Sequence, residues 1–217
     1  MSEIINTYSF DHQEQLIPMD RDDFYAEQIA LAESGQSTNK YVEVVNVFLF
    51  TEHGELIVQK RSREKKHNAN LLDKSMGWHV RCGDTPSLTA MVETVQELQT
   101  PSIVLNSKID FLKTYKTLET YLTTTAILEY IGTHDVIIPK IINGKPIGIG
   151  NRTHIFFGIY WGKVKNIDRE AKGILYYSLE DLIQEMKDFP ETFTQDMHHY
   201  LKHNLSDMRE FLTSIGK

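Results

Sequence analysis

The stretch MGWHVRCGDTPSLTAMVETVQELQ, residues Met76–Gln99, carries acidic side chains at a spacing that can hold a metal ion. Glu93 and Glu97 are four residues apart, so on a helix they lie one turn apart on the same face, with Gln96 beside them. Like charges at this spacing repel each other, and a divalent cation between them would remove the repulsion. Mg²⁺ takes oxygen ligands, usually a few carboxylates together with substrate phosphates. The spacing therefore allows a metal site beside a diphosphate, and also an ordinary solvated helix face.

A helix is expected to carry these residues. Thr85 offers a capping hydroxyl, and the proline after it suits the first position of a helix. Pro101 must end the helix, because proline lacks the backbone donor that a helix interior requires. Apolar residues recur at helical spacing between these limits, which predicts a buried stripe. That stripe consists of Leu88, Met91, Val92, Val95 and Leu98.

Strands are expected on both sides of this helix. YVEVVNVFLF (41–50) and LIVQKR (56–61) predict a hairpin around the turn EHGE, and a polar loop over 62–75 follows. Residues 102–133 are ambiguous between helix and strand. The later elements expected are strands at DVIIPKI, THIFFGIYWGKV and ILYYS, the first two joined by a segment rich in glycine and proline, and helices at LEDLIQEMKDF and about 194–211. This order predicts an α+β or three-layer α/β fold with a mixed sheet.

Composition fits a globular protein in a reducing compartment. The 217 residues suit one domain with a substantial core, and 41% of them are apolar. The net charge of -7 argues against general nucleic-acid binding, which needs a basic face. Cys82 is the single cysteine, which excludes an internal disulfide. No apolar run approaches a membrane span and the N-terminus lacks a signal-peptide pattern, so a cytoplasmic protein without membrane association is expected.

The first 40 residues are polar apart from DRDDFYAEQIALAESGQ, which predicts an amphipathic helix that ends near Gly35. We expect residues 1–40 to form an N-terminal extension packed on a domain of residues 41–217.

The stretch around the glutamates resembles the Nudix box, a glycine loop and helix with the pattern G-x5-E-x7-R-E-U-x-E-E-x-G-U, where U is a bulky aliphatic residue. When the family's HVxxGE is aligned with HVRCGD, the R-E pair falls on Val92 and Glu93, and the E-E pair falls on Gln96 and Glu97. The arginine, one glutamate and two glycines of the pattern are replaced, so this box is degenerate.

Further segments extend the resemblance. The first glutamate of the box falls on Asp84, and Gly77 stands just before the first glycine position. Upstream, LIVQKRSREKKHNANLLDKSMGWHV is similar to LLLQKRS…K…PGLWDISAGGHV of the Nudix branch related to isopentenyl diphosphate isomerase. Downstream, LEDLIQEMKDFPETFTQDMHHYL resembles the end of that branch, where a leucine-rich helix precedes a P-x-x-FTPD segment. The resemblance covers about residues 40–205.

The resemblance implies a Nudix-type α/β/α sandwich with a mixed central sheet and extra N- and C-terminal helices. It implies metal-dependent hydrolysis of a diphosphate linkage in a nucleoside diphosphate joined to another group, or in a related small molecule. A homodimer is compatible with the family.

The resemblance also implies a site. Glu97 would be the principal ligand of Mg²⁺ or Mn²⁺, helped by Glu93, Gln96 and the backbone carbonyl of Gly77, and Glu93 is also a candidate general base. Gln96 offers a neutral oxygen where the family has a carboxylate, so weak metal binding and low activity are expected. Arg61, which matches the arginine of the family's QKR, is a candidate for substrate binding.

The departures from the box leave alternatives open. Val92 replaces the arginine that orients the glutamates in the family, and Asp84 is one methylene shorter than the glutamate it replaces in a supporting position. A domain that keeps the fold and only binds its ligand is therefore an alternative to an enzyme. An isomerase of allylic diphosphates is another, although Cys82 lies in the box loop and no TCCSHP-like segment is present.

Overall fold

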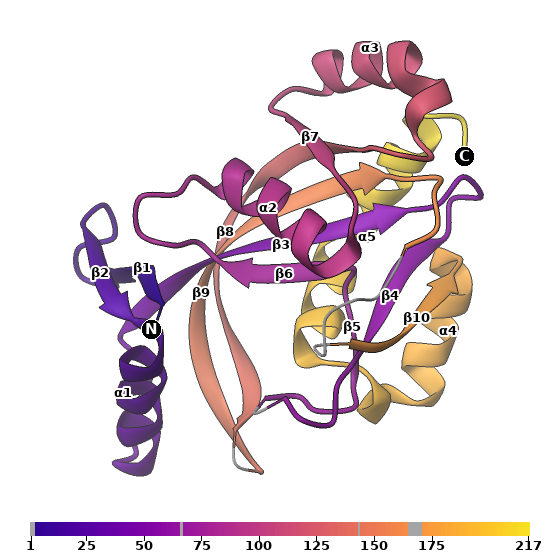
Figure 1. Cartoon of the computed structure of the whole chain (residues 1–217). Helices are drawn as coiled ribbons and strands as arrows, with labels where there is room; N and C mark the ends of the chain where they lie inside the picture. Colours follow the sequence, from indigo (N-terminus) through magenta and orange to yellow (C-terminus); the bar gives the residue numbers. More distant parts are fainter. Residues whose placement is uncertain (1–2, 66, 143, 165–170) are drawn as a thin grey trace.

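The computed structural model describes residues 3–65, 67–142, 144–164 and 171–217, and shows a mixed sheet between layers of helices (Figure 1). The strands are β1 (Ile4–Ser9), β2 (Leu16–Asp20), β3 (Lys40–Phe50), β4 (Leu56–Arg61), β5 (Leu72–Asp73), β6 (Met76–His79), β7 (Ser102–Leu105), β8 (Ala126–Ile142), β9 (Lys145–Ile159) and β10 (Ala171–Tyr177). The helices are α1 (Arg21–Glu33), α2 (Pro86–Leu98), α3 (Lys108–Leu118), α4 (Leu179–Asp188) and α5 (Gln195–Ser214).

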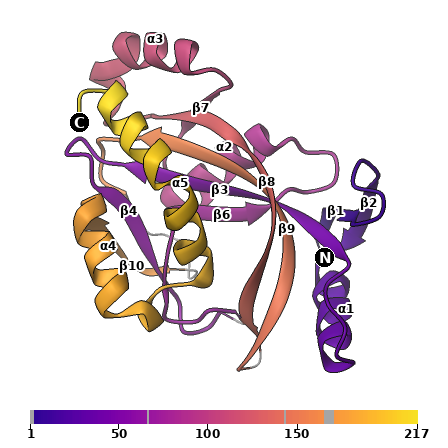
Figure 2. The same ribbon diagram turned by 180° about the vertical axis from the view of Figure 1, so that it is seen from behind.

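The sheet follows the order β10-β4-β3-β9-β8-β7, with β6 paired to β3 and β5 to β4. The β3–β9 and β7–β8 pairs are parallel and the others are antiparallel, so the predicted mixed sheet is confirmed. In Figure 1, α2 lies in front of β3 and β6, and in Figure 2, α5 lies in front of the opposite face. This arrangement confirms the three-layer fold class.

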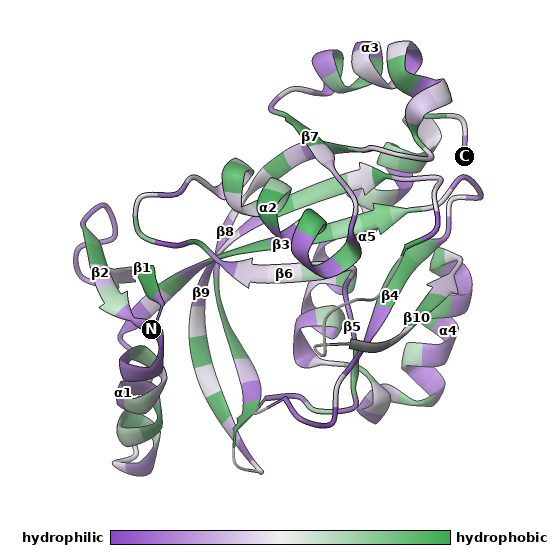
Figure 3. Cartoon of the chain, in the orientation of Figure 1, coloured by the Kyte–Doolittle hydropathy of each residue, from purple (hydrophilic) through white to green (hydrophobic). Residues whose placement is uncertain are grey.

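Alternate side chains of β3 enter different cores, because successive residues of a strand point to opposite faces. Phe48 and Phe50 pack with the helices α4 and α5, while Val47 and Leu49 pack beneath α2. Figure 3 shows β3 and the first half of β4 coloured mainly as hydrophobic residues. The sheet is thus buried on both faces, and it fixes the position of α2 against the ends of β3, β4 and β6.

The predicted start of α2 is confirmed, whereas its predicted buried stripe is right for Leu98 and wrong for Leu88 and Val95. The Thr85 hydroxyl accepts a hydrogen bond from the backbone nitrogen of Leu88 at 3.2 Å. The side chains of Leu88 and Val95 are 42% and 48% exposed, and α2 faces the sheet instead through a face that includes Ala90 and Glu93. Small side chains on that face allow close packing on β3 and β6, and the polar partners described below compensate the buried carboxylates.

Two strand predictions need correction. β3 and β4 pair only at Phe50 and Leu56 before they diverge, so the predicted hairpin exists only at its turn. The segment rich in glycine and proline is part of the long strand β9 rather than a connection, and β8 and β9 form one extended hairpin. Glycine is needed within β9 because a side chain at Gly150 would collide with the carbonyl group of Lys40.

The N-terminal region contains more secondary structure than the sequence predicted. Its predicted helix is confirmed as α1, capped by the Asp20 side chain, which accepts a hydrogen bond from the Asp22 backbone nitrogen at 2.9 Å. The hairpin β1–β2 was not anticipated, and β1 pairs with β3, for example Thr7 with Val42. The strands β1 and β2 therefore extend the central sheet, and the helix α1 that follows them lies alongside β9. None of the described helices is long and apolar enough to cross a membrane.

Candidate active site

Both glutamates of α2 are buried, with exposures of 2% for Glu93 and 8% for Glu97. The Arg81 guanidinium lies 3.8 Å from a carboxylate oxygen of Glu93. The Gln59 side-chain amide, from β4, donates a hydrogen bond of 3.2 Å to Glu97. Burying carboxylates is costly without such partners, so this placement is unusual for a helix whose only role is to pack on a sheet.

Glu97 reaches a cavity of about 820 Å³, which Arg61 and Gly77 also line. Gly77 lies on β6, where an added side chain would run into the side chains of Lys74 and Asn46. The structure therefore brings three of the residues predicted from the sequence to the wall of one cavity. Glu93 lies one turn before Glu97 on the same buried face of α2.

The remaining predicted residues lie farther from the cavity wall. Gln96 is exposed and does not line the cavity. Asp84 is half-buried in the turn before α2, where its charge acts on Arg81. A hydrogen bond to Glu3, together with the charges of Glu3, Glu93 and Asp84, raises the pKa of Arg81 despite partial desolvation. The roles predicted for Gln96 and Asp84 stay predictions.

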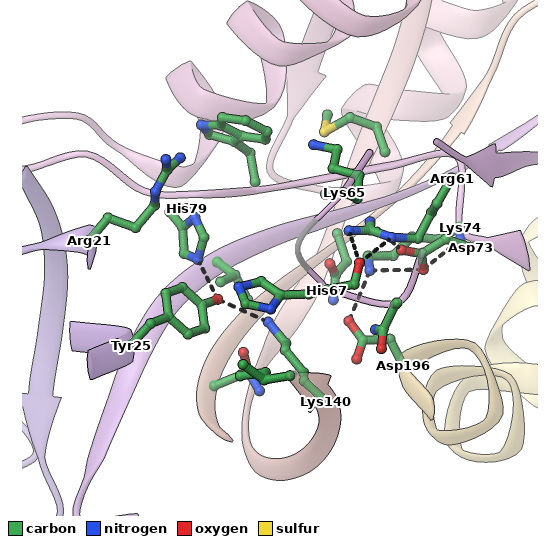
Figure 4. Close-up of a pocket in the computed structure, with 18 of the residues that line it drawn as sticks. Arg21, Tyr25, Arg61, Lys65, His67, Asp73, Lys74, His79, Lys140 and Asp196 are labelled. Carbon is green, nitrogen blue, oxygen red and sulfur yellow. Dashed lines mark hydrogen bonds and ion pairs between the residues drawn. The ribbon is translucent and has the colours of Figure 1, made fainter. Parts of the chain in front are cut away.

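A cluster of buried ion pairs forms one side of the cavity (Figure 4). The Lys74 ammonium lies 3.3 Å from Asp73 and 3.1 Å from Asp196, and Arg61 lies 3.1 Å from the second oxygen of Asp73. Burial opposes the charge of Lys74, but Asp73 and Asp196 outweigh it and raise the pKa of Lys74. Burial likewise opposes the charge of Asp73, and Lys74 and Arg61 hold the pKa of its carboxyl below the ordinary value. Lys74 and Asp73 are therefore both charged at neutral pH.

Sequence reasoning assigned no role to Asp73, Lys74 or Asp196. Asp73 and Asp196 lie in the segments LLDKS and FTQD, both of which resemble the Nudix branch. The resemblance therefore pointed to these segments, but it did not indicate what the two aspartates do. Lys65 was expected in a solvated loop, but it is half-buried and lines the cavity. Tyr25, from α1, also lines the cavity, and nothing in the local sequence relates it to the box.

The oxygen atoms that the chain offers fit a hard cation that also binds ligands from the substrate and from solvent. Glu93, Glu97 and the carbonyl of Gly77 offer oxygen atoms, which suits Mg²⁺ or Mn²⁺ with phosphate and water as further ligands. Among the described residues, no group of three or more histidine, cysteine, aspartate or glutamate side chains has the arrangement of a metal site. Glu170, an acidic residue that the sequence resemblance also suggests as a candidate ligand, lies outside the described residues.

Comparisons with known proteins identify the fold. No protein-family model matches the chain, and no curated protein matches its sequence. The crystal structure of DR0079 from Deinococcus radiodurans is similar with a TM-score of 0.62 at 14% identity, over 93% of this chain and 98% of that one. The MutT protein from Methanosarcina mazei is similar with a TM-score of 0.51 at 15% identity, over 82% of this chain and 96% of that one. The sheet and helices of this protein therefore have the Nudix hydrolase fold.

Proposed function

We propose that this protein hydrolyses a diphosphate linkage in a small molecule with the help of Mg²⁺ or Mn²⁺. The observation that carries the proposal is the burial of Glu93 and Glu97 on one face of α2, where Glu97 lines a cavity that Arg61 also lines. Buried carboxylates beside a cavity with cationic walls suit a metal ion and the phosphates it neutralises. The donor set and the fold both support this reaction class.

The chain supplies several parts of such a mechanism. Glu97, Glu93 and the Gly77 carbonyl would hold the cation. When bound, the cation neutralises phosphate charge and lowers the pKa of a coordinated water. Glu93 is the candidate base that accepts a proton from the attacking water, and Gln59 keeps the Glu97 carboxylate oriented by its hydrogen bond. Arg61 is tied to Asp73 and to the His67 carbonyl, which fixes its guanidinium at the cavity wall as a phosphate contact.

A domain that binds a diphosphate without rapid turnover is the second candidate. It is favoured by Val92, which cannot orient the glutamates as an arginine would, and by the exposure of the neutral Gln96. Isomerase chemistry with a cysteine as proton donor is disfavoured, because Cys82 is exposed and does not line the cavity.

A hydrolysis screen tests the proposal. The purified protein would be incubated with nucleoside diphosphate sugars, dinucleoside polyphosphates and nucleoside triphosphates, in Mn²⁺ or in EDTA, and the products quantified by chromatography. We expect cleavage of at least one diphosphate in Mn²⁺ and none in EDTA. Tight binding of a compound without cleavage would support the binding domain, and neither binding nor cleavage across the panel would contradict the proposal.

Replacement of Gln96 by glutamate is expected to strengthen Mn²⁺ binding by about tenfold, because hard cations are held largely by carboxylates. Gln96 follows Glu93 by three residues but is exposed beside the buried face of α2, so a glutamate there has room to turn towards an ion held by Glu93 and Glu97. Isothermal titration calorimetry of both proteins with Mn²⁺ measures the change. The exposed Gln99 supplies the control substitution Gln99→Glu, and tight wild-type binding that Gln96→Glu leaves unchanged would refute the expectation.

A further inference from the structure

The part of the cavity next to α1 has a high density of positive charge. We call it the cationic end, and it consists of Arg21, Tyr25, Lys65, His67, His79 and Lys140. These residues come from α1, the loop after β4, β6 and β8, which converge there although they are distant in sequence (Figure 4). Asp22 and Glu64 also line the cavity, and both residues are exposed to solvent.

Tyr25 connects the groups of the cationic end. Its hydroxyl lies 3.1 Å from the Nε2 atom of His79 and accepts a hydrogen bond of 3.3 Å from the Lys140 ammonium. Its ring packs against the His67 ring with 5.0 Å between centroids. The hydroxyl of a tyrosine held between a histidine and a lysine is in position to take part in a polar contact with a ligand in the cavity.

The loop after β4 is anchored to the β8–β9 hairpin, so the cationic end is assembled before a ligand arrives. His67 forms a backbone bridge with Ile142, and the Asn68 side chain accepts a hydrogen bond of 3.2 Å from the backbone nitrogen of Ile141. Lys140 is thereby held near His67 by contacts that do not involve its own ammonium. Preorganised charges bind a ligand more tightly because less freedom is lost on binding.

The positive charges of Arg21, Lys65 and Lys140 line the same part of the cavity. Arg21 has a carboxylate partner in Glu3 at 3.1 Å. Within the described chain, Lys140 forms no ion pair with a carboxylate, and its hydrogen bond goes to the neutral Tyr25 hydroxyl. An anion at this end would therefore enter a positive potential.

We propose that the cationic end binds a phosphate group of the substrate that lies beyond the diphosphate under attack. Glu97 lines another part of the same cavity, and the carboxylates of Asp73 and Asp196 near it are paired with Arg61 and Lys74. A substrate that spans the cavity would place a metal-bound diphosphate near Glu97 and a further phosphate near Lys140. The preferred class is a diphosphate compound with an additional phosphate, such as a nucleoside triphosphate. This assignment rests on the proposed function, but phosphate binding at the cationic end does not require hydrolysis.

Titration with inorganic phosphate in EDTA, at neutral pH and low salt, tests the cationic end without metal or catalysis. We expect saturable binding in the wild-type protein, about tenfold weaker binding in Lys140→Gln, and retained binding in Lys140→Arg, because a charged hydrogen bond to phosphate is lost only in the first variant. Lys145→Gln is the matched control, since Lys145 is exposed on the same hairpin and does not line the cavity. Melting temperatures verify that each variant is folded.

The two proposals fail in different ways. Equal phosphate affinity in wild type and Lys140→Gln, or no saturable binding in the wild type, would overturn the assignment of the cationic end even if diphosphates are hydrolysed. Phosphate binding that depends on Lys140 in a protein that cleaves nothing would keep the assignment and reject hydrolysis. If the screen finds a substrate, Lys140→Gln is expected to raise KM for nucleoside triphosphates about tenfold and to leave compounds without the additional phosphate nearly unchanged.

Discussion

Replacement of Glu97 by glutamine is expected to reduce kcat/KM for diphosphate hydrolysis by at least about 100-fold. The carboxylate lies at the cavity wall, and a metal ion there contributes several kcal/mol to the stabilisation of a phosphoryl transition state. Glutamine keeps the size of the side chain and can still accept the hydrogen bond from Gln59, so the fold should be preserved. Initial rates with the best compound of the screen, at several Mn²⁺ concentrations, measure the effect.

The control for this experiment is Glu52→Gln, which removes the same charge from an exposed turn. It should retain wild-type rates. Phosphate release that is equal in wild type and Glu97→Gln would indicate contaminating activity and support the binding domain instead of an enzyme.

Replacement of Lys74 by methionine is expected to lower the free energy of unfolding by about 3–5 kcal/mol at neutral pH, because it removes the cation shared by Asp73 and Asp196 and leaves the buried Asp73 paired with Arg61 alone. The Lys74 side chain is 6% exposed and contacts both Asp73 and Asp196. Methionine fills a similar volume, so the loss reports on charge more than on packing. Urea denaturation at pH 7 measures the change, with Lys113→Met, on the exposed side of α3, as the control.

The pH dependence separates charge from packing in this variant. Without Lys74, burial would outweigh the remaining charge of Arg61 and raise the folded-state pKa of Asp73 above its unfolded value, so folding would take up a proton as the pH falls. The stability deficit should therefore shrink between pH 7 and pH 5, and Asp196→Asn should recover part of it at pH 7. A deficit that is independent of pH and unaffected by Asp196→Asn would attribute the loss to packing alone.

Local sequence was sufficient to predict where α2 begins and which of its acidic residues share a face. Thr85 and the following proline predict the start of α2 because a cap and a fixed backbone angle act within a few residues. The spacing of Glu93 and Glu97 predicts that they share a face for the same reason. The burial of Leu88 and Val95 was predicted wrongly, since apolar periodicity favoured it and the structure leaves both side chains exposed.

The cavity depends on contacts between segments that are far apart in the chain. Tyr25 and Lys140 are 115 residues apart, and Lys74 and Asp196 are 122 residues apart. Local sequence preferences cannot predict such pairs, because the two residues interact only when the sheet and the helices have assembled. The N-terminal residues looked like a polar appendage for this reason, although α1 supplies part of the cavity wall.

By itself the amino-acid sequence determined the helix of acidic residues, the strands β3, β4, β8, β9 and β10 in part, and the fold class, since these follow from capping, periodicity and the order of elements. Only the tertiary structure decided that α2 turns its glutamates inward, that a lysine lies buried between two aspartates, and that one end of the cavity is cationic. These features depend on which partners compensate a buried charge, and the partners are chosen by packing across the sheet.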